Sequence, residues 1–167
     1  MGILNNLIQR VSSLGKSVIL PESNDPRIIE AAVLLNEKSV ARPVLCGNPE
    51  EIIAHFEKLG KSYSGIEIID INNTALISEL VSLYQKQRPN VSEKVALRLV
   101  KKPLIFAGMM VASGRVDAMV AGAASTTADV IQAAALTAGY QKNISKASSF
   151  LSWRCLMVRF IFLLTVR

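Results

Sequence analysis

A chain of 167 residues, half of them hydrophobic, is long enough for one domain with a buried core. Its net charge is +6, but three of the nineteen basic residues and none of the thirteen acidic ones lie after residue 150, which leaves residues 1–150 at +3. This balance, with no basic cluster interleaved with aromatic side chains, argues against nucleic-acid binding. Cys46, Cys155 and His55 lack the spacing of a zinc site, so no metal or cofactor is expected.

The chain begins with a segment of helical periodicity. Leu4, Leu7, Ile8 and Val11 recur at the spacing of an amphipathic helix, which differs from the pattern of a signal peptide. No run reaches the roughly 18 apolar residues that a membrane span needs, and the sparse cysteines suit a reducing compartment. We therefore expect a cytoplasmic protein that makes no contact with a membrane.

Short apolar runs then alternate with helical patterns. Four strands are predicted, at residues 17–21, 43–46, 66–70 and 116–121. Six further helices are predicted, starting near Pro26, Pro49, Thr74, Ser92, Pro103 and Asp129. The order α-β-α-β-α-β-α-α-α-β-α predicts an α/β fold of three layers, αβα, around a largely parallel sheet.

Three polar loops follow predicted strands. Because ligands of parallel sheets lie beyond the carboxyl ends of the strands, we expect these loops at one functional edge. In the first loop, we interpret Glu22, Asn24, Asp25 and Arg27 as holding an ion pair that shapes the edge of a cleft rather than as catalytic groups. The three loops are LPESNDPR at 20–27, CGNPEE at 46–51 and AGAASTTAD at 121–129.

The third loop predicts an anion site. Gly122 and Ala123 are small enough for the backbone to approach a ligand closely, and the amides at a helix N-terminus can bind phosphate. Ser125, Thr126 and Thr127 supply hydroxyl groups beside them. The alternative is simple capping of the helix, which accounts for one hydroxyl but not for several.

Four segments of the chain occur in a characteristic order: LPESNDPR (20–27), PVLCGNPEEI (43–52), FAGMMVASGRVDAMVAGAASTTADV (106–130) and SSF (148–150). Together they resemble the phosphate acetyl/butyryl transferase family. The resemblance spans residues 1–150 and implies an isocitrate-dehydrogenase-like fold, with this chain as the first part of a two-domain enzyme. It also implies a reaction in which acetyl-CoA and phosphate give CoA and acetyl phosphate, with CoA as a substrate rather than a cofactor.

Two alternatives to acetyl transfer stay open. The turn sequence GAxxxTAD is closer to the acetyltransferases than to the butyryl branch, yet butyryl-type transfer is not excluded. A non-catalytic acyl-phosphate-binding or interaction module is the alternative from another class. Full-length relatives are expected to be homo-oligomers.

The resemblance also implies roles for single residues. Hydroxyl residues at the turn line the family's substrate site, which carries over to Thr126 and Thr127. Arg88 falls near a CoA-linked arginine, although it stands four residues after Tyr84 where the family has three, and a surface arginine is the alternative. A second CoA-linked arginine is replaced by Gln132, which supplies no charge to a phosphate. The groups credited with the chemistry lie in the family's C-terminal part, so no catalytic residue is expected here.

The residues after Phe150, LSWRCLMVRFIFLLTVR, differ in composition from the family. Reverse translation with one T restored in the opening run of T gives FFIMALPDGPVHFSADCA, which is the family continuation. We therefore expect residues 1–150 to be an incomplete N-terminal domain, residues 151–167 to be an out-of-frame tail, and the chain alone to be inactive. A genuine hydrophobic helix or membrane anchor is the alternative reading of the tail.

Overall fold

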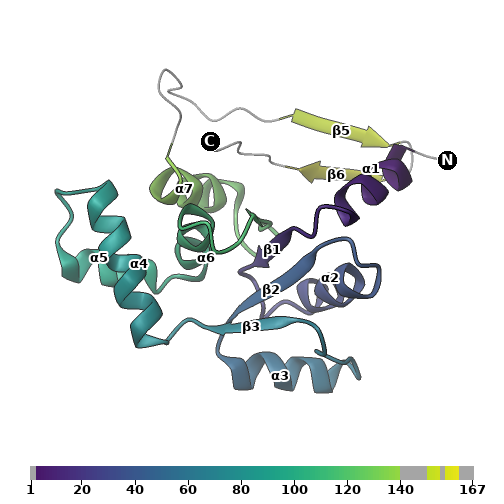
Figure 1. The fold of residues 1–167 in the computed structure, drawn as a ribbon, viewed down its shortest axis with the longest axis horizontal. Helices are drawn as coiled ribbons and strands as arrows, with labels where there is room; N and C mark the ends of the chain where they lie inside the picture. The colour runs from purple at the N-terminus through teal and green to yellow at the C-terminus, as the bar shows by residue number, and fades with distance from the viewer. Residues whose placement is uncertain (1–2, 140–149, 155–156, 162–167) are drawn as a thin grey trace.

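The computed structural model describes residues 3–139, 150–154 and 157–161, and its elements follow the predicted order (Figure 1). The first eleven are α1 (Ile3–Ser12), β1 (Ser17–Leu20), α2 (Pro26–Glu37), β2 (Arg42–Gly47), α3 (Pro49–Lys58), β3 (Glu67–Asp70), α4 (Thr74–Gln87), α5 (Glu93–Val100), α6 (Pro103–Ala112), β4 (Ala118–Met119) and α7 (Thr127–Thr137). Two further strands, β5 (Phe150–Arg154) and β6 (Met157–Ile161), pair antiparallel in a sheet of their own.

The first four strands form one sheet in the order β3-β2-β1-β4. Each neighbouring pair is parallel, which confirms the predicted parallel sheet. β1 lies between β2 and β4, and Ile19 pairs with Val44 on one side and with Met119 on the other. The central position of β1 brings the loops after β1, β2 and β4 to the same edge of the sheet.

Helices cover both faces of this sheet, so the predicted three layers are confirmed. Successive residues of a strand point to opposite faces. Ile19 and Val44 accordingly join the core formed with α4, α5, α6 and α7, whereas Leu20 and Leu45 join the core formed with α2 and α3. All four side chains are essentially inaccessible to water.

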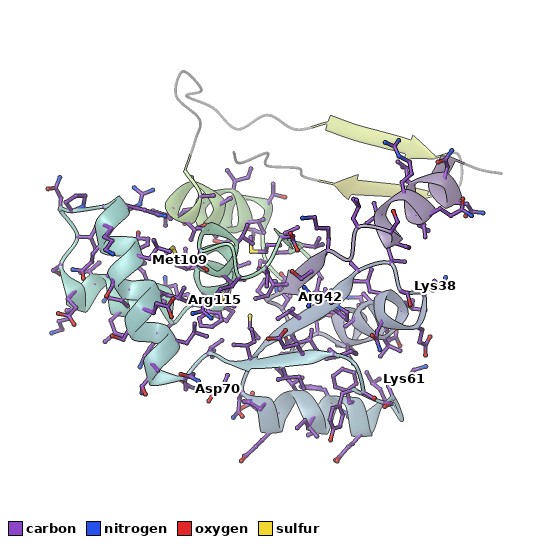
Figure 2. All side chains as sticks on the ribbon, in the orientation of Figure 1. Lys38, Arg42, Lys61, Asp70, Met109 and Arg115 are labelled. Atoms are coloured by element: carbon purple, nitrogen blue, oxygen red, sulfur yellow. The ribbon has the colours of Figure 1, made fainter. Side chains whose placement is uncertain are left out.

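Helix α6 lies in the middle of its layer. Its residues from Ile105 to Met110 are all buried, as the uniformly apolar sequence predicts. Met109 lies inside this layer, whereas the charged ends of Lys38 and Lys61 extend at the surface (Figure 2). Gly108 permits close packing against α7, because a methyl group added there would overlap the side chain of Thr137.

Two elements differ from their predicted form. The strand expected at 116–121 pairs with β1 over Ala118–Met119 alone, and the chain then bends at Gly122, where φ is +110°. Helix α7 begins at Thr127, two residues before the predicted start at Asp129, because the side chains of its first turn form a capping box. Neither difference moves the turn away from the carboxyl edge of the sheet.

Helix α1 confirms the predicted N-terminal helix, although its apolar Leu7 and Val11 remain exposed. Among the described helices, none has both the length and the apolar character needed to cross a bilayer. Within residues 151–167, the structure describes only the backbone of 151–154 and 157–161. That this segment is an out-of-frame tail stays a prediction.

Candidate functional site

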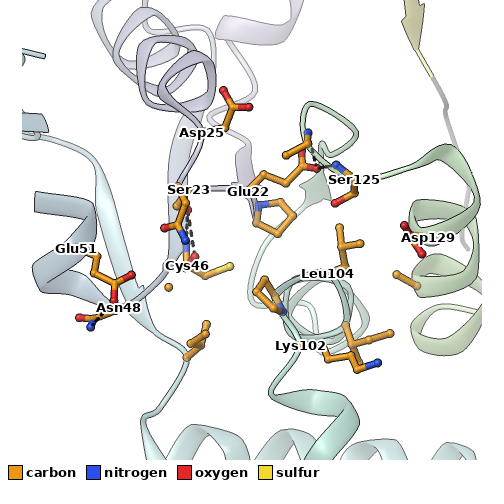
Figure 3. A pocket seen from close by; sticks show the side chains of 18 of the residues that line it. Glu22, Ser23, Asp25, Cys46, Asn48, Glu51, Lys102, Leu104, Ser125 and Asp129 are labelled. Atoms are coloured by element: carbon orange, nitrogen blue, oxygen red, sulfur yellow. Dashed lines mark hydrogen bonds between the residues drawn. The ribbon is translucent and has the colours of Figure 1, made fainter. Parts of the chain in front are cut away.

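An open cavity of about 930 Å³ lies at the carboxyl edge of the sheet (Figure 3). All three loops that the sequence places at this edge contribute to its wall. Ile71 and Asn72, which follow β3, and the segment 102–105 at the start of α6 complete it. The convergence of the loops is therefore as predicted, whereas the contribution of α6 was not foreseen.

Four helices begin at this cavity, namely α2, α3, α6 and α7. Helix N-termini carry partial positive charge and favour anions. Three of them are capped by the chain's own side chains, since Asp25, Asn48 and Thr126 each accept a backbone N–H of the first turn. In α6, the N-cap residue Lys102 makes no side-chain cap and Pro103 has no N–H, so the amides of Leu104 and Ile105 are left without a side-chain acceptor.

Glu22 reaches across the edge to the turn at 122–127. One carboxylate oxygen accepts the amides of Gly122 and Ala123, both at 2.8 Å, and the other accepts those of Ala124 at 3.0 Å and Ser125 at 2.6 Å. Burial alone would raise the pKa of Glu22, but the Ser125 side chain and the amides of the turn outweigh it and hold that pKa below the ordinary value of 4.5. The carboxylate is thus the anion held by these amides.

The five residues predicted to bind phosphate have different surroundings. Ser125 lines the cavity, and Gly122 and Ala123 give their amides to Glu22 without lining it. Thr126 forms a capping box, in which its hydroxyl oxygen accepts the Asp129 amide at 3.2 Å. Thr127 is the exposed first residue of α7 and does not line the cavity either. Capping thus accounts for one hydroxyl, and phosphate binding by this turn stays a prediction.

The ion pair predicted in the first loop is present, but Glu22 is not one of its members. Arg27 Nη2 lies 2.6 Å from Asp25 Oδ2 and donates at 2.5 Å to the carbonyl oxygen of Ala123. Asp25 also caps α2, with its Oδ1 accepting the Arg27 amide at 2.9 Å. The first loop therefore contacts both the amides and a carbonyl group of the turn.

Of the two residues considered for CoA binding, Gln132 and Arg88, only one lies at the cavity. Gln132 lines the cavity. Arg88 does not, because its Nε and Nη2 donate to the carbonyl oxygens of Leu136 at 3.1 Å and Ala135 at 2.7 Å, and its guanidinium carbon lies 5.9 Å from the centre of the Tyr84 ring. This geometry joins α4 to the end of α7. A contact of Arg88 with CoA stays a prediction.

Lys102 and Cys46 also line the cavity. Lys102 is the only basic residue among the described residues that line the cavity, and it is not among the residues that the sequence singles out. The proline that follows it marks a helix start and could have indicated this position. Burial raises the pKa of the Cys46 thiol to about 12, so this group stays protonated and is no nucleophile. Within the described residues, no three His, Cys, Asp or Glu side chains gather as metal ligands.

Known proteins that are similar to this chain in sequence or fold are named phosphate acetyltransferase or phosphotransacetylase. A family model described as phosphate acetyl/butaryl transferase matches residues 2–163. A phosphate acetyltransferase of Acetivibrio thermocellus is 34% identical over 136 residues, which are 80% of this chain and 40% of the relative. One of Staphylococcus aureus is 29% identical over 147 residues, which are 87% of this chain and 45% of the relative.

Solved structures show the same likeness. The EutD phosphotransacetylase from Staphylococcus aureus superposes with a TM-score of 0.82 at 27% identity and covers 93% of this chain and 48% of that one. A phosphotransacetylase from Streptococcus pyogenes gives 0.81 at 25% identity, over 87% and 46%. The chain therefore spans less than half the length of these relatives. Sequence and fold agree that it belongs to the phosphate acetyl/butaryl transferase family.

Proposed function

We propose that this chain forms one wall of an acyl-transfer site, at which phosphate attacks the thioester of acetyl-CoA and gives acetyl phosphate and CoA. The observation that carries the proposal is the cavity onto which four helix N-termini open, one of them without a side-chain cap and beside Lys102. Phosphate, acetyl phosphate and CoA are all anions. Lys102 and the uncapped start of α6 favour an anion at that part of the wall, whereas the carboxylates of Glu22, Asp25, Glu51 and Asp129 line the rest of the cavity.

The reaction asks for positioning and for stabilisation of negative charge. The oxygen of phosphate attacks the thioester carbonyl, the tetrahedral oxyanion collapses, and the thiolate of CoA leaves and takes up a proton. Holding both reactants in place and donating hydrogen bonds to the oxyanion are the main contributions that a protein makes to such a step. We assign phosphate binding to Lys102 and to the amides of Leu104 and Ile105 in the first turn of α6, with Ser125 lining the cavity on the other side. We assign the acyl group to the apolar side chains of the same two residues.

The same proposal includes the features that depend on the rest of a family enzyme. This chain alone turns over no acetyl-CoA, because the groups credited with the chemistry belong to the family's C-terminal part. The full-length enzyme is cytoplasmic and homo-oligomeric. Residues 151–167 are translated out of frame. The intact mass of the native product measures the last point: 18.1 kDa supports a translated tail, and about twice that mass contradicts it.

Titration of the purified chain with inorganic phosphate and with acetyl phosphate tests the binding site. Lys102→Met should weaken phosphate binding about tenfold, since hydrogen bonds to a charged group contribute roughly 1.5–3 kcal/mol. Lys101→Met is the matched control, because Lys101 is the neighbouring lysine and does not line the cavity. Equal affinities of the two variants would contradict the assignment of Lys102. Release of CoA by the purified chain would contradict its inactivity.

A further inference from the structure

Four consecutive amides converge on a single carboxylate at the edge of the cavity. The donors are the N–H groups of residues 122–125, called the turn amides below, and the acceptors are the two oxygens of Glu22, two amides on each. Figure 3 shows Glu22 and Ser125 directed toward each other across the mouth of the cavity. With 8% of its surface exposed, Glu22 is shielded from water and depends on these donors.

Successive amides that point to one spot form a concave anion site in many proteins. Here the chain fills the site itself, with a side chain that lies 100 residues or more from its donors. The carbonyl side of the turn is held as well, because Arg27 donates to Ala123 at 2.5 Å. The segment 20–27 thus holds the N–H groups of the turn through Glu22 and one of its carbonyl groups through Arg27.

We propose that Glu22 is a positioning residue whose carboxylate serves as the permanent anion of the turn amides and so fixes the place of Ser125 in the cavity wall. The turn amides then maintain the shape of the turn, and substrate phosphate is bound by other donors. The inference rests on the proposed function, since it is the assigned phosphate site that Ser125 helps to line.

The test is chemical rescue of Glu22→Ala in the full 167-residue chain. This variant removes the carboxylate and leaves the turn amides facing an empty space of about its size. Formate, a small carboxylate, should fill that space, whereas formamide, of the same size and neutral, should not. Thermal unfolding and the amide resonances of residues 122–125 report on the turn, and phosphate affinity reports on Ser125.

Asp117→Ala provides the matched control. Asp117 also accepts hydrogen bonds from a segment 100 residues away, but from one backbone amide, one hydroxyl and one lysine rather than from four converging amides. Its removal therefore leaves no anion site of this kind, and formate should not restore it.

We expect Glu22→Ala to lower the melting temperature by roughly 5–10 °C and to weaken phosphate binding several-fold, and formate alone to reverse both changes. Formate should also shift the turn amides of Glu22→Ala, whereas phosphate should leave the amides of Gly122 and Ala123, which do not line the cavity, unshifted in the wild type. If Glu22→Ala does not fold, refolding in formate but not in formamide supports the same conclusion, and Glu22→Gln, which keeps the space filled, should show no rescue.

Three results would overturn the inference: equal rescue by formate and formamide, rescue of Asp117→Ala, or a shift of the Gly122 and Ala123 amides when phosphate is added to the wild type. Failure of the proposed function has a different signature. In that case phosphate does not bind the wild type at all, while the response of Glu22→Ala to formate is unaffected.

Discussion

A carboxylate joins the β1 segment to the β4 segment at each end of β1. One of these carboxylates belongs to the β4 segment and the other to the β1 segment. At the amino end, Asp117 of the segment around β4 accepts the Ser17 amide at 2.8 Å and hydroxyl at 2.9 Å, and Lys16 Nζ at 2.7 Å. At the carboxyl end, Glu22 of the β1 segment accepts the turn amides at 2.6–3.0 Å. The same two segments are thus joined twice, once from each side.

The environments of the two carboxylates differ. The side chain of Asp117 keeps 36% of its surface exposed and pairs with Lys16, which is itself 53% exposed, whereas Glu22 is 8% exposed and relies on backbone donors and a hydroxyl group. A buried charge without its donors costs far more than an exposed one. The carboxylate whose donors matter more for stability therefore lies at the cavity, and the more exposed one lies at the opposite end of β1.

Acid should remove both contacts and so have the largest effect. The pKa of Glu22 lies below its ordinary 4.5, because the hydrogen bonds to the turn outweigh burial, and that of Asp117 lies below 3.8, chiefly through Lys16 and Ser17. A lowered pKa in the folded state adds stability above the ordinary value, and this stability is lost as the pH falls through the lowered one. Unfolding free energies at pH 7 to 2 should thus decrease steeply below about pH 4.5.

A double variant, Glu22→Gln with Asp117→Asn, isolates this acid effect. The other charged groups near Glu22, namely Arg27, Asp25 and Asp129, are unchanged in it, so the difference from the wild type reports on the two carboxylates. We expect that difference to be constant above pH 4.5 and to shrink below it. A difference that does not depend on pH would contradict the assignment of the lowered pKa values.

Glu22→Gln alone should cost about 2–4 kcal/mol at pH 7, because the new NH2 group faces two amide donors and leaves them without an acceptor. Urea denaturation followed by circular dichroism measures this loss. Glu50→Gln, an exposed glutamate in the first turn of α3, is a control for the removal of one charge and should change the stability by less than about 0.5 kcal/mol. Equal losses in both variants would contradict the special position of Glu22.

Ser23→Ala tests a third contact at the cavity end. The buried Ser23 hydroxyl donates toward the carbonyl oxygens of Leu20 at 3.0 Å and Cys46 at 3.1 Å, and it accepts the Cys46 amide at 3.2 Å, which ties β1 to β2. We expect a loss of about 1–2 kcal/mol, since a buried amide would lose its acceptor. Ser13→Ala removes an exposed hydroxyl and should be close to neutral in the same denaturation experiment.

Asp117→Asn should have a smaller effect than Glu22→Gln or Ser23→Ala, because the side-chain oxygen of asparagine can still accept the Ser17 amide and the ion pair lost with Lys16 is exposed. Lys16→Met removes only the ion pair and should stay within about 0.5 kcal/mol of the wild type. The comparison of the two ends would be wrong if Asp117→Asn destabilised the protein more than Glu22→Gln in parallel denaturation curves.

Local patterns were sufficient to predict most of the fold. Helix α4 begins at Thr74 as predicted, where Asn73 caps it, and it ends at Gln87, before the break that Pro89 imposes. Asp25 and Pro26 likewise mark the start of α2. Each of these features acts over a few residues, and for this reason a single sequence reveals them.

The site was predicted less completely, because its key contacts are long-range. The sequence indicated that the turn at 122–127 suits an anion, but nothing local to the turn identifies Glu22 as that anion. Arg88 was treated as exposed or bound to CoA, whereas its partners are carbonyl groups 47 and 48 residues away. Such pairings depend on how helices and strands pack and not on spacing within one segment.

Each of the two carboxylates lies about 100 residues from its hydrogen-bond donors along the chain, and this separation bears on the folding rate. Each contact closes a loop of about 100 residues, and the entropy of closing such a loop must be overcome before the contact can form. We expect both contacts to be absent from the transition state of folding. Weakening either one should therefore leave the folding rate nearly unchanged and accelerate unfolding, so that these two carboxylates set the lifetime of the folded state.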